Sequence, residues 1–209
     1  MNFALRSIRY FIIIFGIVLA VGAFFVLRGN APLSVDGFIR LEEFYAWAAV
    51  AFLYISLLAT PLIQVVPGLP VWFRVIYIKA RRATGVSAFF FAALHASIVF
   101  FVFMGGWSGL AGLPLQYLTA TGLGFVALVI LWLLAATSMD VMVRMLGRKW
   151  KMLHRLVYVA AVLILIHAMI LGSHLQTKGA VFWIFSGAAL FLLALEALRI
   201  MRAIRKTFS

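Results

Sequence analysis

The sequence predicts an all-α membrane protein, a single polytopic bundle of six transmembrane helices formed by residues 1–209. Of the residues, 67% are hydrophobic and only 11% are charged, whereas a soluble domain carries about 25% charged residues. The apolar residues fall in runs of about 20, the length that crosses roughly 30 Å of hydrocarbon as a helix. The net charge of +13 would suit a nucleic-acid binder, but the basic residues cluster between apolar runs. We therefore expect the lipid bilayer as a partner and no nucleic acid.

Each expected span ends at a glycine, a proline or a cluster of charges. The first is longer than the core of a secretory signal and lacks a clear cleavage site, so we interpret it as a membrane helix. The second ends at Pro67-Gly68 and the third at Gly105-Gly106. The six spans are Tyr10–Leu27, Phe44–Val66, Thr84–Met104, Tyr117–Ser138, Met152–Leu171 and Ala180–Met201.

The distribution of basic residues predicts that both termini are cytoplasmic. Lys and Arg accumulate on the cytoplasmic side of a membrane. Fifteen of the 18 lie in the N-terminal segment, the second and fourth connections and the C-terminal tail. The other side holds only Arg28, Arg40 and Lys178. A simpler interpretation of the basic segments is that they set the topology and hold anionic lipid.

The acidic residues are all expected in loops or at the ends of spans. They are Asp36, Glu42 and Glu43 in the first outer loop, Asp140 at the cytoplasmic edge of the fourth span, and Glu196 near the end of the sixth. Glu196 precedes Arg199 by one turn, which predicts a surface pair. Since no carboxylate is expected deep in a span, an ion pathway built on acidic residues is not expected.

Two histidines are expected inside the membrane at matched depth. His95 lies 13 residues past Arg82, and His167 lies 12 residues past Arg155. Both spans begin at the cytoplasmic face, so each histidine lies roughly 18–20 Å from its basic flank, in the middle of its span. Either histidine alone suggests an interhelical hydrogen bond. As a pair on parallel helices, with no carboxylate expected nearby, they favour a haem iron bound from both sides.

Small residues surround both histidines. Gly85, Ala88, Ala92 and His95 share one helical face, and Ala160 shares a face with His167. Such faces leave room for a flat macrocycle, and they are equally typical of close helix packing in membranes.

The remaining histidines have several open roles. His154 lies 13 residues before His167, which on an ideal helix gives about 20 Å of rise but separates the two side chains by roughly 140°. It is therefore a candidate ligand of a second haem, a partner of a haem propionate, part of a cytoplasmic site, or an interfacial residue. His174 is interpreted as a loop residue.

Basic and aromatic residues flank His154 and the third span. The charged side chains could hold haem propionates or a flavin phosphate through charge-assisted hydrogen bonds. They are Arg81, Arg82, Arg148, Lys149 and Arg155. Trp72, Trp150 and Tyr158 could lie near an electron path, although aromatic anchoring at the membrane interface is the simpler interpretation for the tryptophans.

Parts of the chain resemble the MsrQ (YedZ) family of the ferric-reductase-like transmembrane superfamily. The resemblance covers roughly residues 58–170. Its segments are Ala59-Thr60-Pro61-Leu62, Arg81-Arg82-Ala83-Thr84-Gly85 with Phe89-Phe90-Phe91-Ala92-Ala93-Leu94-His95, and Leu146-Gly147-Arg148-Lys149-Trp150 with Leu153-His154-Arg155-Leu156-Val157-Tyr158, followed by His167.

The resemblance implies a haem b subunit of a bacterial inner membrane, an electron-transfer subunit rather than a catalytic one. Its haem ligands would be His95, His167 and His154, and FMN would be a further cofactor that no motif here places. The electron donor would be a quinol or a cytosolic flavin reductase. The acceptor would be a periplasmic molybdopterin enzyme that reduces methionine sulfoxide.

The outer segment before the fourth span departs from that family. Where MsrQ proteins usually carry an acidic, Lys-Arg-Pro-Tyr-like stretch, residues 112–118 carry no charge. This leaves a stand-alone ferric-reductase-like cytochrome as one alternative. A permease or scaffold subunit without redox chemistry is another.

Overall fold

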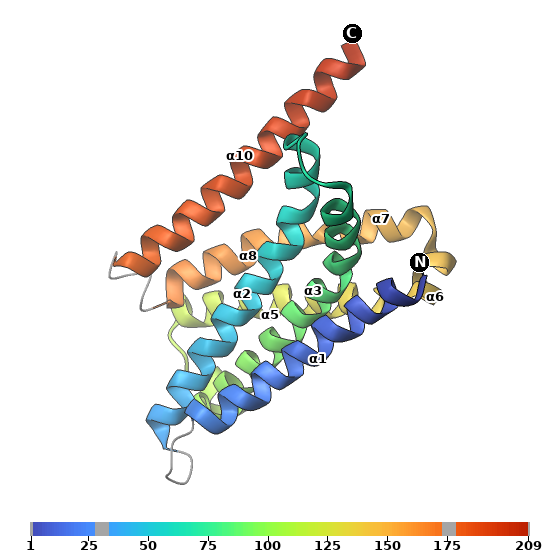
Figure 1. Cartoon of the computed structure of the whole chain (residues 1–209). Helices are drawn as coiled ribbons and strands as arrows, with labels where there is room; N and C mark the ends of the chain where they lie inside the picture. Colours follow the sequence, from blue (N-terminus) through green and yellow to red (C-terminus); the bar gives the residue numbers. More distant parts are fainter. Residues whose placement is uncertain (1, 28–33, 173–178, 209) are drawn as a thin grey trace.

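The structure is a computed structural model, and it describes residues 2–27, 34–172 and 179–208. Six helical segments are long and apolar enough to cross a membrane, which confirms the predicted multi-pass helical bundle (Figure 1). The elements are α1 (Asn2–Leu27), α2 (Val35–Val65), α3 (Val71–Ile98), the π-helix η1 (Val99–Phe103), α4 (Trp107–Ala111), α5 (Leu115–Ala136), α6 (Asp140–Leu146), α7 (Arg148–His154), α8 (Leu156–Leu171) and α10 (Ala180–Phe208). His174, Arg28 and Lys178 lie outside the described residues.

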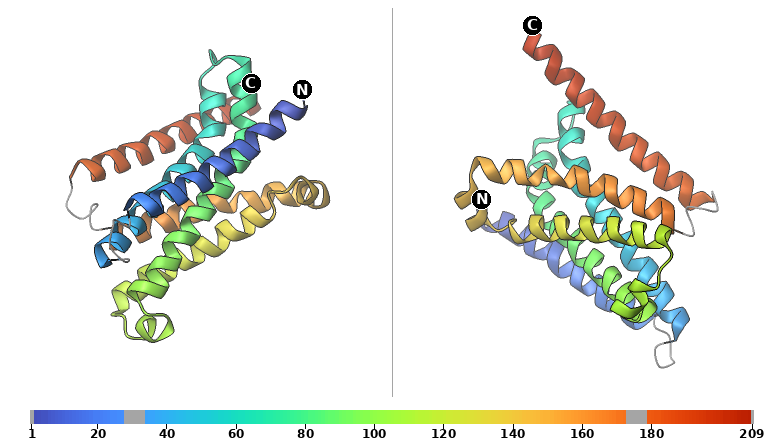
Figure 2. Two further views of the ribbon diagram at one scale, coloured as in Figure 1. Left: turned by 60° about the horizontal axis from the view of Figure 1, so that its bottom comes forward. Right: turned by 180° about the vertical axis from the view of Figure 1, so that it is seen from behind.

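Four helices, α2, α3, α5 and α8, form the centre of the bundle. α3 packs against α1, α2 and α5, while α5 packs against α8 and α10 packs against α2. In Figure 1, α1 lies at one edge and α10 at the other, and Figure 2 shows α5 and α8 side by side. The central cluster consists of Leu53, Leu57, Ala88, Leu131, Leu134, Val157 and Ala160.

The small residues near the two histidines serve mainly to bring helices together. Ala88 and Ala160 have no exposed surface and lie in the central cluster. A Cβ at Gly85 would lie 3.5 Å from the hydroxyl oxygen of Ser56 on α2. Ala88 and Ala160 therefore serve close packing, whereas Gly85 also lines a cavity of the bundle.

Two helices extend well beyond the apolar spans that the sequence indicates. α2 begins at Val35, where the hydroxyl of Ser34 accepts a hydrogen bond from the Gly37 N–H at 3.1 Å and Asp36 occupies the first turn. Both features stabilise a helix N-terminus. The expectation that Asp36, Glu42 and Glu43 lie in a loop is therefore wrong, because charge ends an apolar run without ending a helix. α3 likewise begins at Val71, before its basic residues.

A π-helix and two glycines end the third span. η1 continues α3, and Gly105 and Gly106 then take positive φ angles of 65° and 83°. The Gly106 N–H donates to the Phe100 carbonyl at 2.8 Å and closes the turn. A Cβ on Gly109 would lie 1.6 Å from the Met104 carbonyl oxygen, so the short helix α4 requires glycine there.

Basic side chains from distant segments gather at one end of the bundle, which we call the basic end. Arg9 and Arg82 both contact Asp140, and the Arg81 guanidinium donates to the Thr60 hydroxyl at 2.9 Å. Arg202 of α10 donates to the Val65 carbonyl at 2.8 Å, where α2 ends. These contacts join α1, α2, α3, α6 and α10.

The predicted pair between Glu196 and Arg199 is confirmed, with 2.9 Å between the carboxylate and the guanidinium. The Tyr158 hydroxyl donates to the same carboxylate at 3.1 Å. Tyr158 therefore connects α8 to α10.

Candidate functional site

The structure brings the rings of His95 on α3 and His167 on α8 next to each other, in an edge-to-face arrangement. Their ring centroids are 6.4 Å apart and their planes lie at 85° to one another. The two residues are 72 positions apart in the chain, so the fold and not the local sequence creates this contact.

A carboxylate lies beside His95, contrary to the expectation from the sequence. One carboxylate oxygen of Glu42 is 3.0 Å from His95 Nδ1, and the Glu42 backbone carbonyl oxygen is 3.4 Å from the same nitrogen. The expectation failed because α2 begins seven residues before Glu42, which places its side chain on a helix that packs against α3.

His167 is held by the backbone of α5. Its Nδ1 lies 2.8 Å from the carbonyl oxygen of Ala120. One turn later on α5, a Cβ added at Gly124 would come within 2.7 Å of the same nitrogen. The absent side chain at Gly124 is therefore what allows the imidazole to lie against α5.

Along the helices, the histidine pair lies nearer the end of the bundle opposite the basic end. His167 lies only four residues before the end of α8, and His95 lies eight residues before the end of η1. Counting from the basic flanks gave equal depths for the two histidines. It did not show how soon the helices end beyond them.

The two imidazoles are a donor set that could hold a haem iron. Both Nδ1 atoms face oxygen acceptors, which leaves the Nε2 atoms of His95 and His167 for a metal. Within the described residues no group of three or more His, Cys, Asp or Glu could hold a metal ion. A pair of imidazoles suits a metal whose remaining ligands come from a porphyrin.

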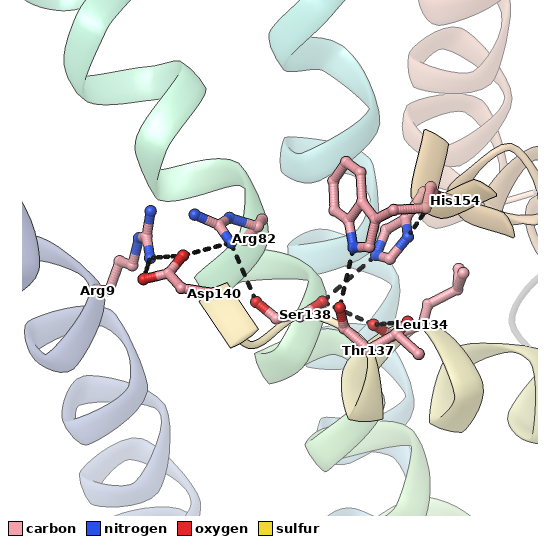
Figure 3. A network of polar contacts seen from close by, with 8 residues as sticks. Arg9, Arg82, Leu134, Thr137, Ser138, Asp140 and His154 are labelled. Atoms are coloured by element: carbon pink, nitrogen blue, oxygen red, sulfur yellow. Dashed lines mark hydrogen bonds and ion pairs between the residues drawn. The ribbon is translucent and has the colours of Figure 1, made fainter. Parts of the chain in front are cut away.

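His154 lies at a second place, a cavity of about 510 Å³ at the basic end. Its ring stacks on Trp150 with centroids 3.9 Å apart, and its Nδ1 lies 3.1 Å from the Trp150 carbonyl oxygen. Its Nε2 lies 3.5 Å from the Ser138 hydroxyl. Figure 3 shows this group at the connection that follows α5. The tryptophan indole N–H donates to the Thr137 carbonyl at 2.9 Å. Trp150 therefore has a specific hydrogen-bond partner, which interfacial anchoring alone does not require.

Of the four arginines expected near a cofactor, Arg82 is one of the two that line this cavity. Its guanidinium lies 2.7 Å from the Asp140 carboxylate and donates to the Ser138 carbonyl at 3.2 Å (Figure 3). Arg148 and Arg155 are exposed and do not line the cavity. Arg81, also expected near a cofactor, does line it.

Asp140 balances part of this positive charge. Arg9 donates to both of its carboxylate oxygens at 3.0 Å. This hydrogen bond from Arg9, and then the one from Arg82, hold the pKa of Asp140 below its ordinary value. Asp140 therefore remains ionised and links α1, α3 and the start of α6.

A comparison with known families identifies the core of the bundle. The sequence model of a family described as "Ferric reductase like transmembrane component" matches residues 45–165, more than half of the chain. The matched segment begins in α2 and ends in α8, so it includes all of α3 and α5 and parts of α2 and α8. It contains His95 and His154 and stops two residues before His167.

Proposed function

Because the chain belongs to the family of ferric-reductase-like transmembrane components, we propose that it is a haem b subunit that carries electrons across a membrane. The family membership and the six apolar helices support a multi-pass membrane component of electron transfer. The observation that carries the proposal further is the pair formed by His95 and His167, 6.4 Å apart between ring centroids.

The residues around the pair suit electron transfer better than oxygen chemistry. A haem bound there would supply one-electron chemistry at its iron. His95 and His167 would occupy both axial positions, which leaves no open position for a substrate. Glu42 and the Ala120 carbonyl fix the orientation of the two rings, as partners of metal-bound histidines commonly do.

We place the electron donor at the basic end and on the cytoplasmic side of a bacterial inner membrane. The sequence has no Gly-x-Gly-x-x-Gly fingerprint that opens a helix after a strand, so the donor would be a quinol or a separate flavin reductase. The cavity beside His154 is a candidate for a second haem or for FMN. These assignments are supported by the charge distribution and by the resemblance to the MsrQ family.

The haem proposal is tested by the absorption spectrum of the purified protein in detergent. Reduced-minus-oxidised spectra with pyridine haemochrome quantitation should show a low-spin b-type haem. His95→Ala and His167→Ala should each lose it, while the haem stoichiometry of His154→Ala shows whether His154 binds a second one. A colourless protein that added haem cannot reconstitute would contradict the proposal and favour a permease or scaffold.

For the acceptor, we propose a periplasmic molybdopterin enzyme that reduces methionine sulfoxide, by resemblance to the MsrQ family. The prereduced protein should be reoxidised rapidly when such an enzyme and methionine sulfoxide are both added, and slowly when either is omitted. Equally fast reoxidation by a ferric chelate alone would instead favour a stand-alone ferric-reductase-like cytochrome. The ferric-chelate control is necessary because residues 112–118, in the outer segment, lack the charges that MsrQ proteins usually carry there.

A further inference from the structure

We propose that Glu42 is a positioning residue that lowers the redox potential of the haem site by polarising His95. The inference rests on the proposed function, because it assigns a role to a contact of a proposed axial ligand. It differs from that function in naming a residue on α2, outside the two helices that carry the ligands.

The two histidines have different partners, and the difference is one of charge. His95 Nδ1 lies 3.0 Å from a carboxylate oxygen of Glu42, whereas His167 Nδ1 lies 2.8 Å from the neutral carbonyl of Ala120. In the part of the chain that the structure describes, the Glu42 carboxylate contacts the imidazole of His95. No arginine or lysine is within 4.0 Å of that carboxylate among the described residues.

The backbone around Glu42 is held firmly in place. Leu41 and Tyr45, on either side of it in the sequence, are only 1% and 5% exposed and pack with Phe91 of α3. The Tyr45 hydroxyl also donates to the Ala20 carbonyl of α1 at 3.1 Å. This packing fixes the backbone position of Glu42. The side chain of Glu42 is 22% exposed. A carboxylate in such surroundings is costly unless it is paired, and His95 supplies the partner.

The direction of the effect follows from the charge. When Nε2 of His95 binds iron, Nδ1 carries the ring proton and donates it to Glu42. A hydrogen bond to an ionised acceptor is about twice as strong as one to a neutral carbonyl. It moves electron density onto the imidazole and from there to the metal, and the nearby negative charge adds to the effect at low dielectric. Both contributions stabilise the ferric form relative to the ferrous form, which lowers the potential.

Potentiometric titration of the purified haem-loaded protein tests this role. In Glu42→Gln the amide oxygen can still accept the hydrogen bond, but the charge is lost. We expect the ferric-to-ferrous equilibrium to shift at least tenfold toward ferrous haem, which is about 59 mV for a one-electron couple. Glu42→Asp, which keeps the charge, should return most of the way to the wild-type potential. The matched control is Asp36→Asn, an exposed acid six residues earlier on the same helix, which should leave the potential unchanged.

The outcomes separate this inference from the proposed function. Potentiometry reads only haem that is bound, so reduced loading of Glu42→Gln does not obscure its potential. Equal potentials in wild type and Glu42→Gln would overturn the role of Glu42 and leave the haem proposal standing. A shift of the same size in Asp36→Asn would also overturn it, because the effect would then be one of general charge. A wild type that binds no haem would overturn the proposed function, and this inference with it.

Discussion

Gly124 is the residue that fixes how closely His167 approaches α5. Because it has no side chain, the imidazole can lie against the helix and reach the carbonyl of Ala120 at 2.8 Å. The sequence gives no sign of this role, since neither a turn nor a positive φ angle calls for glycine here. Only the packing of α5 against α8, two elements that are distant in sequence, reveals it.

Replacing Gly124 with alanine should displace the imidazole of His167. The added Cβ would lie 2.7 Å from Nδ1 and 2.8 Å from Cε1, too close for the ring to remain where it is. We expect lower haem content and a weaker low-spin spectrum in Gly124→Ala. Gly122→Ala is the control, because a Cβ there would meet nothing within 4 Å. Equal loss of haem in both variants would argue against the close contact with His167.

Asp140 predicts how stability depends on pH. Its pKa is lowered in the folded protein by the hydrogen bond from Arg9 and then by Arg82, so ionised Asp140 favours folding. This stabilisation is complete above the ordinary aspartate pKa of about 4 and is lost as the pH falls through the lower folded value. Since the side chain is 49% exposed, it contributes about 1 kcal/mol or less.

We therefore expect Asp140→Asn to unfold at a slightly lower temperature than wild type at pH 7. The two melting temperatures, measured in detergent, should converge below about pH 4. High salt should also narrow the difference, because it screens a partly exposed pair. A difference that persists unchanged in acid would show that Asp140 acts through its packing and not through its charge.

At the scale of elements, apolar runs and basic clusters predict the six helices but not their full lengths. The number and order of the spans follow from the hydrophobic requirement of the bilayer. The extension of α2 back to Val35 does not follow from that requirement, because the part of a helix that lies outside the membrane can carry charged residues. For this reason the spacing of His95 and His167 could be recognised from the sequence, whereas Glu42 could not be connected with them.

The fifth span illustrates a second limit of helical periodicity. The angle of roughly 140° expected between His154 and His167 assumes one ideal helix. In the structure the helix is locally irregular at Arg155, where α7 meets α8 and the Arg155 N–H donates to the Met152 carbonyl at 3.2 Å, so the segment is not one ideal helix. Trp150 lies four residues before His154 on α7, so helical spacing could group these two, whereas Ser138 lies in the connection after α5 and could not be grouped with them from sequence spacing.

Trp150 should stabilise the connection between α5 and α7. Its indole donates to the Thr137 carbonyl at 2.9 Å just after α5 ends, and phenylalanine cannot replace that donor. Trp150→Phe should lower stability by about 1 kcal/mol, as measured by thermal unfolding in detergent. Trp72→Phe is the control, because Trp72 is 65% exposed and should change stability little. Similar losses in the two variants would favour a shared role as interfacial anchors.

For the whole molecule, the basic end predicts the orientation in the membrane. Contacts of Arg9, Arg81, Arg82 and Arg202 join five elements at this end, away from the histidine pair. By the positive-inside rule we expect this end to be cytoplasmic. Electrons that reach the histidine pair from there would have crossed most of the bundle toward the outer side.

Single cysteines can test this orientation, because the chain has none of its own. Lys149 lies in the first turn of α7 at the basic end, and Ser108 lies in α4, which follows η1. Each is replaced by cysteine in turn. In intact spheroplasts, an impermeant maleimide should label Ser108→Cys readily and should label Lys149→Cys only after lysis. The reverse pattern would place the basic end outside and contradict the proposed direction of electron transfer.

The central claim, that His95 and His167 bind one haem iron, is tested most directly by electron paramagnetic resonance of the oxidised protein. Two axial imidazoles whose planes lie near the observed 85° should give a strongly anisotropic low-spin ferric signal. That signal should vanish in both His95→Ala and His167→Ala, and it should persist in His154→Ala. A wild-type spectrum that is wholly high-spin, or a strongly anisotropic signal that survives the loss of either histidine, would contradict the account.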